Sequence, residues 1–175
     1  MIEGTQRHSL VDRMIGAARL DAAVYEEVEH DESATPQALL VVVIGAIAAG
    51  IGALGGGAGG LLIGLVASLL GWAVYALVAY WVGTNLFKGP ETSATPGELL
   101  RTLGFASSPR VLLVFGFIPV LGLLISLAVS IWMLVTTVVA IRQALDFDTG
   151  RAIGTAVVSW LALFAVTVIV AVAVA

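Results

Sequence analysis

The residues best suited to bind a metal ion form one acidic run, Glu26-Glu27-Val28-Glu29-His30-Asp31-Glu32. Clustered carboxylates beside an imidazole can hold a divalent cation, because both groups are ordinary metal ligands. The alternative is an acidic helix end in contact with water, which is the common role of an exposed charged run before an apolar segment. We favour the solvated face and expect no metal site. The chain has no Cys, which excludes disulfides, thiolate metal sites and cysteine nucleophiles.

A single arginine inside an apolar stretch is the second candidate. If a membrane span begins near Leu103 and ends at Pro119, helical rise places Arg110 about 13 Å below the outer surface. An arginine at that depth costs at least about 2.5–3.5 kcal/mol on insertion scales and usually marks a functional site. The alternative, which we favour, is a short helix from which Arg110 reaches the headgroups on the charged side. The expected partners of Arg110 are a lipid phosphate and the side chains of Ser107, Ser108 and Asn85.

The other candidates are charged residues that could bind a protein partner or lipid headgroups: Arg101, Arg142, Asp146, Asp148 and Arg151. The last four are close in sequence, so local pairing of the two carboxylates with the two arginines is their default structural role.

Motifs of known catalytic types are missing from the sequence. It contains no nucleophile elbow, Walker loop or dinucleotide fingerprint, and the Gly-rich stretch 55–60 lacks the Lys-Ser/Thr of a phosphate loop. The apolar spans hold no carboxylate for ion coupling. The formal net charge of −4 argues against nucleic acid as a partner. We therefore expect a protein that is not an enzyme and has no cofactor.

The charged residues lie in three short stretches, 1–32, 88–110 and 142–151, and apolar segments separate them. A hydrophobic content of 59% is far above that of soluble domains. If the chain crosses a membrane five times, all three charged stretches lie on one side. We expect that side to be cytoplasmic, because Lys and Arg concentrate there.

The number of spans depends on residues 111–141, which carry no charge. As one helix this segment would be roughly 46 Å long, well beyond a hydrocarbon core of about 30 Å. A break at Pro119 shortens it and returns every Lys and Arg to one side. The predicted spans are therefore 37–54, 61–86, 103–118, 120–141 and 152–175. They form an all-α bundle of five membrane helices, with the N-terminus cytoplasmic and the C-terminus external.

The first 36 residues are predicted to be a cytoplasmic segment ahead of a transmembrane domain, 37–175. Apolar residues recur at helical spacing over 9–30, and Ser9 with Asp12 suits a helix start, so we expect one amphipathic helix there. It could pack on its own domain, which we favour, or bind the membrane reversibly.

Two series of small residues predict close helix packing. One comprises Gly45, Ala49 and Ala53, and the other Gly52, Gly56, Gly60, Gly64 and Ser68. We favour a tight hairpin of the first two spans, and a homodimer seam is the alternative.

From about residue 97 onward the chain resembles the Yip1 domain family. The stretch from Leu100 to Pro109 is similar to that family's Gly-Tyr-x-x-x-Pro pattern, with Phe105 in place of the tyrosine. The similarity continues through Ile118-Pro119, Ile131-Trp132, Ala140-Ile141-Arg142-Gln143-Ala144 and Arg151-Ala152.

The resemblance, closest to prokaryotic members, implies a five-span cell-membrane protein that acts as a non-enzymatic adaptor. Eukaryotic members associate with small prenylated GTPases and with one another. We therefore expect a scaffold whose charged cytoplasmic face binds protein or lipid partners, with membrane lipids around it and a homo-oligomer as one option. The alternative is a lipid or small-solute conduit centred on Arg110.

Overall fold

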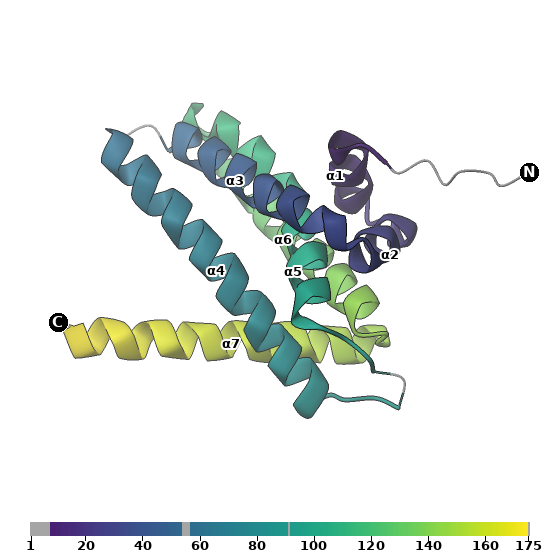
Figure 1. The fold of residues 1–175 in the computed structure, drawn as a ribbon. Helices are drawn as coiled ribbons and strands as arrows, with labels where there is room; N and C mark the ends of the chain where they lie inside the picture. The colour runs from purple at the N-terminus through teal and green to yellow at the C-terminus, as the bar shows by residue number, and fades with distance from the viewer. Residues whose placement is uncertain (1–7, 54–56, 91, 175) are drawn as a thin grey trace, which may run out of the picture.

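The computed structural model describes residues 8–53, 57–90 and 92–174, and every regular element in these ranges is helical. The long helices run between the two ends of the molecule, while α1 and α2 lie together near the N-terminus (Figure 1). The elements in chain order are α1 (Leu10–Ala18), α2 (Ala22–His30), η1 (Glu32–Ala34), α3 (Thr35–Gly52), α4 (Gly57–Asn85), α5 (Pro96–Ala106), η2 (Ser108–Phe117), α6 (Leu121–Ala144) and α7 (Thr149–Val174).

Four helices of the described ranges are long and apolar enough to cross a membrane: Glu32–Gly52, Gly57–Asn85, Leu121–Ala144 and Thr149–Ile169. They coincide with four of the five predicted spans, and the predicted break at Pro119 is confirmed because α6 begins at Leu121. The prediction of an ordinary helix over 103–118 is wrong, since that segment combines the end of α5 with a 3₁₀ helix, η2.

Proline explains where α5 ends. Pro109 has no N–H to donate, and its ring disfavours the α conformation of Ser108, so α5 stops at Ala106 and the chain continues as η2. A 3₁₀ helix rises about 2.0 Å per residue, so the ten residues of η2 extend about 20 Å, against about 15 Å for an α-helix. On this rise Arg110 lies about 16 Å from the end of the segment at Ile118, deeper than the α-helical estimate.

The α5–η2 segment runs parallel to α3 and touches it at regular intervals. A Cβ atom on Gly104 would lie 2.7 Å from the Cβ of Ala38, and one on Gly45 would lie 3.0 Å from the Cβ of Arg110. Farther along, a Cβ on Gly116 would lie 3.2 Å from the carbonyl oxygen of Gly52. The contacts recur every seven residues on α3, which is about two turns of an α-helix. They recur every six residues on the α5–η2 segment, and from Arg110 to Gly116 six residues are two turns of a 3₁₀ helix.

Small residues therefore join α3 to η2, and the prediction that the two small-residue series bind the first two spans together is wrong. Gly45 and Gly52 face η2, whereas a Cβ on Gly60 or Gly64 of α4 would meet nothing within 4 Å. Gly56 lies outside the described residues. A homodimer seam along α4 stays a prediction.

The predicted single helix over 9–30 is two helices. The capping box of Ser9 and Asp12 starts α1 as expected. The helix ends because Leu20 adopts φ 65°, and the N–H groups of Leu20 and Asp21 donate to the carbonyls of Ala17 and Gly16, which is a Schellman closure. Asp21 then caps α2 through the N–H of Ala23.

Both N-terminal helices pack on the bundle, as we favoured, rather than lying apart from it. Tyr25 is fully buried and donates its hydroxyl hydrogen to the carbonyl of Ala17, 3.1 Å away, which ties α2 to α1. The indole of Trp132 on α6 donates to the carbonyl of Ala18 at 2.7 Å, which ties α1 to α6.

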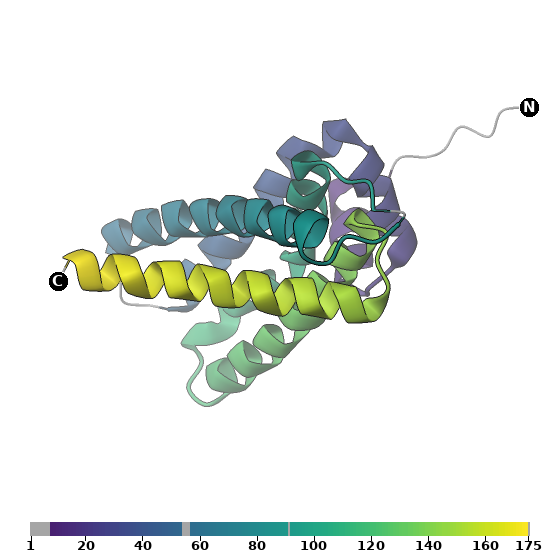
Figure 2. The same cartoon turned by 90° about the horizontal axis from the view of Figure 1, so that it is seen from below.

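The three charged stretches lie at one end of the molecule. In Figure 1 the N-terminal helices, the α4–α5 connection and the α6–α7 turn lie on one side, opposite the C-terminal end of α7. Figure 2 shows α4 and α7 lying side by side, and the hydroxyl of Tyr75 donates across this contact to the carbonyl of Ala156 at 3.2 Å.

Candidate docking face and its buried charges

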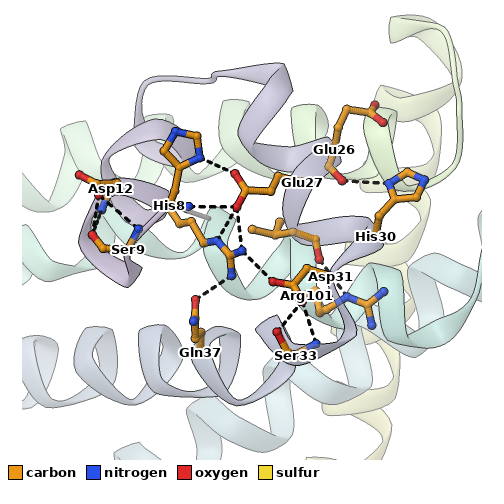
Figure 3. A network of polar contacts seen from close by, with 12 residues as sticks. His8, Ser9, Asp12, Glu26, Glu27, His30, Asp31, Ser33, Gln37 and Arg101 are labelled. Atoms are coloured by element: carbon orange, nitrogen blue, oxygen red, sulfur yellow. Dashed lines mark hydrogen bonds and ion pairs between the residues drawn. The ribbon is translucent and has the colours of Figure 1, made fainter. Parts of the chain in front are cut away.

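A buried arginine fixes the N-terminal helices to the start of α3. The side chain of Arg13 is 2% exposed, and its guanidinium donates to Glu27 at 2.7 Å, to Asp31 at 2.7 Å and to Gln37 at 2.9 Å. Figure 3 shows Glu27, Asp31 and Gln37 converging on one point, with His8 on the outer side of Glu27. The charge of Arg13 is thus matched by two carboxylates, as a buried ion must be.

Arg13 was missed in the sequence, where it looks like one polar residue in an amphipathic helix. The carboxylates that bind it follow 14 and 18 residues later, across the break at Leu20. A single helix over 9–30 would have kept these groups apart. The pairing depends on the turn at Leu20, which brings α2 back against α1. The spacing of Arg13 and Asp31 in the sequence does not reveal it.

Arg101 is the second buried cation. It is 6% exposed, and its Nε donates to the carbonyl oxygens of Val28 at 2.9 Å and Glu29 at 3.0 Å. A second guanidinium nitrogen donates to the same backbone carbonyl of Glu29. These carbonyls belong to the last turn of α2, where the helix dipole favours positive charge. Arg101 therefore holds the end of α2 against α5, and its predicted binding of a partner stays a prediction.

The acidic run is not the evenly solvated face that we favoured. His30 and Glu32 are exposed, but Glu29 is only 5% exposed, and its Oε2 accepts no hydrogen bond from any residue that the structure describes. Burial, followed by the negative charge of Glu26, raises the pKa of Glu29 to about 7. Glu29 lies four residues after the fully buried Tyr25, so both lie on the face of α2 that packs against the core.

Arg110 is half-buried in a small pocket of about 220 Å³ that is also lined by Trp72, Tyr75 and Ser107. Its guanidinium donates to the hydroxyl of Ser68 on α4 at 3.2 Å. The expected hydrogen bonds to Ser107, Ser108 and Asn85 are not the ones formed.

Short side chains near helix ends bind their own backbone instead of Arg110. Ser107 donates to the carbonyl of Gly104 and Ser108 to that of Phe105, both at 2.6 Å, while Asn85 donates to that of Trp81 at 2.8 Å. These contacts lie three or four residues back in the chain, which is the usual local competition for such groups. A lipid partner for Arg110 stays a prediction.

The remaining predicted residues lie around the α6–α7 turn. Arg142, Asp146 and Asp148 are exposed, and the Arg151 side chain is 42% exposed. Asp148 pairs with Arg151 at 3.4 Å and caps its N–H at 3.0 Å, which is one of the two local pairs expected. Arg142 instead donates to Gln143 at 3.1 Å.

The three charged stretches contact one another. Gln143 donates to the carboxylate of Glu26 at 2.7 Å, and Arg101 binds the end of α2. Gly89 in the α4–α5 connection lies directly under the guanidinium of Arg151, so that any Cβ there would overlap it. Together the outer parts of these stretches form one face, here called the charged face: residues 8–32, 88–90, 92–101 and 142–151.

Helices alone in the described ranges, four of them apolar and of membrane length, together with one charged end define an integral membrane protein. The family model of the Yip1 domain matches residues 21–170, so the chain belongs to the Yip1 domain family. The match begins well before residue 97, the point from which the sequence resembles the family, and it includes α2. Comparison with curated proteins and with solved structures finds no match for this chain.

Proposed function

We propose that this protein is a non-enzymatic membrane adaptor that crosses the cell membrane five times and presents its charged face to partners in the cytoplasm. The observation that carries the proposal is the contact among the three charged stretches, at Gln143 with Glu26, Arg101 with Val28 and Arg151 with Gly89. Stretches far apart in the sequence thereby present one surface, as a docking platform requires.

The exposed charges of the α6–α7 turn are the part of this face that we assign to docking. Arg142, Asp146, Asp148 and Arg151 project from a single short segment. Arg101 and Arg13 have their donors committed to α2 and its neighbours, so they position the face. Solvent-exposed charges at a rim mainly set partner choice and association rate, which suits a reversible adaptor.

Two observations support five crossings with the charged face inside. The α5–η2 segment follows α3 in parallel from the contact of Gly104 with Ala38 to that of Gly116 with Gly52, so it covers the same distance as this part of α3. Apart from Arg110, which is half-buried in the pocket with Ser68, the positive charges of the described residues also lie at the charged face, as the positive-inside rule favours for cytoplasmic loops.

The orientation is tested with single cysteines, since the chain has none of its own. Asp148→Cys and Val120→Cys lie in turns at opposite ends and both side chains are exposed. In intact cells a membrane-impermeant thiol reagent should label Val120→Cys and leave Asp148→Cys unlabelled until the membrane is opened. The reverse pattern would place the charged face outside.

The docking role is tested by crosslinking tagged protein in native membranes and capturing it in mild detergent. A protein recovered at near-stoichiometric yield should be lost when Arg142→Gln and Arg151→Gln are combined, and retained in the matched control Arg19→Gln, whose side chain is also exposed. Equal recovery from the double variant and the control would remove the α6–α7 turn from the docking surface. The conduit alternative gains no support from the pocket at Arg110, which is small and already contains a hydrogen bond to Ser68.

A further inference from the structure

One face of α2 gathers the groups of a metal site. Glu26, Glu29 and His30 are separated by three and four residues, so they lie on the same side of the helix. A carboxylate oxygen of Glu26, one of Glu29 and a ring nitrogen of His30 all lie within 4.8 Å of one another. Two carboxylates and one imidazole are a ligand set that suits Zn²⁺ and other divalent transition metals.

Glu29 distinguishes this cluster from an ordinary acidic patch. Its side chain is 5% exposed, and its Oε2 is buried without a hydrogen-bond partner among the described residues. The buried cation Arg101 donates to the backbone carbonyls of Val28 and Glu29 and forms no ion pair with the Glu29 carboxylate among the described residues. A buried, unpaired carboxylate is costly unless a cation or a proton neutralises it.

The two outer ligands are already held by groups behind them. Gln143 on α6 donates to Glu26 at 2.7 Å and orients its carboxylate. The Nδ1 of His30 lies 2.9 Å from the carbonyl of Glu26, and because a carbonyl only accepts, this nitrogen carries the hydrogen. The Nε2 lone pair is then free to bind a metal. Figure 3 shows the contact of His30 with Glu26. Support of this kind behind the ligands is typical of metal sites.

We propose that Glu26, Glu29 and His30 form a divalent transition-metal site on one face of α2, with Glu29 on its buried side and His30 on its exposed side. Ligand atoms bound to one Zn²⁺ at about 2.1 Å lie about 3.4 Å apart in a tetrahedron, so atoms that lie within 4.8 Å of one another need to approach by at most about 1.4 Å. Glu26 and His30 lie at the surface and can make this movement. The remaining coordination positions are filled by water. Asp146 and Glu98 are close enough to act electrostatically on Glu29 and add to the negative field.

The site would join α2 to the rest of the charged face, because Gln143 brings α6 to the same cluster. This inference does not depend on the docking role, since the metal would bind whether or not a protein partner exists. The proposal therefore has its own test.

The full chain, purified in detergent and stripped with a chelator, is titrated with Zn²⁺ at pH 8 against a fluorescent zinc indicator. We expect one equivalent of Zn²⁺ to bind, and the affinity to fall at least tenfold in Glu29→Gln and in His30→Gln. The matched controls are Glu32→Gln and His8→Gln. Both side chains are exposed, and both lie outside the cluster of Glu26, Glu29 and His30. Both controls should bind as the unmodified chain does.

A second measurement separates loss of the site from loss of the fold. Zn²⁺ should raise the thermal midpoint of the unmodified chain and of both controls, because a ligand that binds only the folded state stabilises it. Glu29→Gln should fold in the absence of metal and show no such rise. Co²⁺ in place of Zn²⁺ should give visible absorption bands that change in His30→Gln.

Either of two results would overturn the proposal. One is a chain that binds no Zn²⁺ in the titration. The other is a chain whose zinc affinity and Co²⁺ spectrum are the same in Glu29→Gln and His30→Gln as in the controls, which would place the metal elsewhere.

Discussion

Gly52 of α3 lies directly against the carbonyl oxygen of Leu113 in η2, and no side chain fits between the two backbones. Its neighbour across the contact is another glycine, Gly116, so both segments carry their smallest residue at the closest approach. In lipid, where burial of apolar surface gives little driving force between helices, such approaches provide the packing energy. The α3–η2 pair is the tightest part of the fold.

Gly52→Ala should therefore destabilise the protein strongly. The added Cβ would overlap a backbone atom that cannot rotate away, so we expect a loss at or above the roughly 1–3 kcal/mol typical of overpacking. Thermal unfolding in detergent, followed by Trp fluorescence, measures the effect. Gly64→Ala is the matched control, because a Cβ there meets nothing within 4 Å and alanine favours the helix by about 1 kcal/mol. Equal midpoints for the two variants would show that the close contact is not maintained in solution.

Arg101→Met should loosen α2 without unfolding the bundle. The variant removes the donors to Val28 and Glu29 and leaves two buried carbonyls unsatisfied, at a cost of about 1–3 kcal/mol. Amide hydrogen exchange should then accelerate in residues 22–30 and remain slow in α3. Arg142→Met, an exposed arginine, serves as the control and should leave exchange in α2 unchanged.

Arg13→Met should be more damaging than Arg101→Met. Glu27 and Asp31 would lose the cation that faces both of them, and breaking a buried ion pair on one side costs about 3–5 kcal/mol. Limited proteolysis should cut between residues 8 and 34 in this variant first. If the cleavage pattern of Arg13→Met matches that of the unmodified chain, the network at Arg13 is not what holds α1 and α2 in place.

Stability should fall on both sides of a middle pH. Glu29 has its pKa raised from near 4.5 to about 7, so the folded state holds this proton more tightly than the unfolded state does. The contribution of Glu29 to the free energy of unfolding is therefore complete below pH 4.5. It is lost as pH rises through 7, by about 1–3 kcal/mol.

Asp31 acts in the opposite direction. A hydrogen bond from Ser33, followed by those from Arg13, lowers the pKa of Asp31 to about 2, so its contribution is present above about pH 4 and disappears as pH falls toward 2. Thermal midpoints in chelator-treated buffer from pH 3 to 8.5 measure both changes. Hydrogen bonds also raise the pKa of His8 and of His30, so Glu29→Gln should reduce the alkaline decline and keep the acid one. An unchanged alkaline decline in that variant would assign it to the histidines or another group.

The sequence predicted those parts of the fold that depend on length and polarity. The break at Pro119 followed from an uncharged segment too long for one crossing, and the gathering of charge at one end followed from alternation of spans. The helix start at Ser9 was recognisable, because a capping box is local in sequence.

The parts that were not predictable depend on backbone geometry or distant partners. Leu20 ends α1 with a positive φ, a conformation that usually marks glycine, so its side chain gave no warning. The 3₁₀ form of η2 depends on its fit to α3, and the hydropathy of a segment does not report its rise per residue. The burial of Glu29 and the partners of Arg13 likewise arise only once α2 has folded back on the bundle.

The helices α3 and α4 are similarly apolar, but the contact of α3 with η2 restricts which residues α3 can carry. In the most apolar 18-residue stretch of the first membrane-length helix, 39% of the residues are buried by the rest of the chain. In that of α4 the share is 6%. Position 52 accepts only glycine and position 45 is tight against Arg110, while most positions of α4 face lipid and need only remain apolar. Over evolutionary time α4 should therefore vary freely among Leu, Ile, Val and Ala, and the glycines of α3 should persist where nearly every other apolar position has changed.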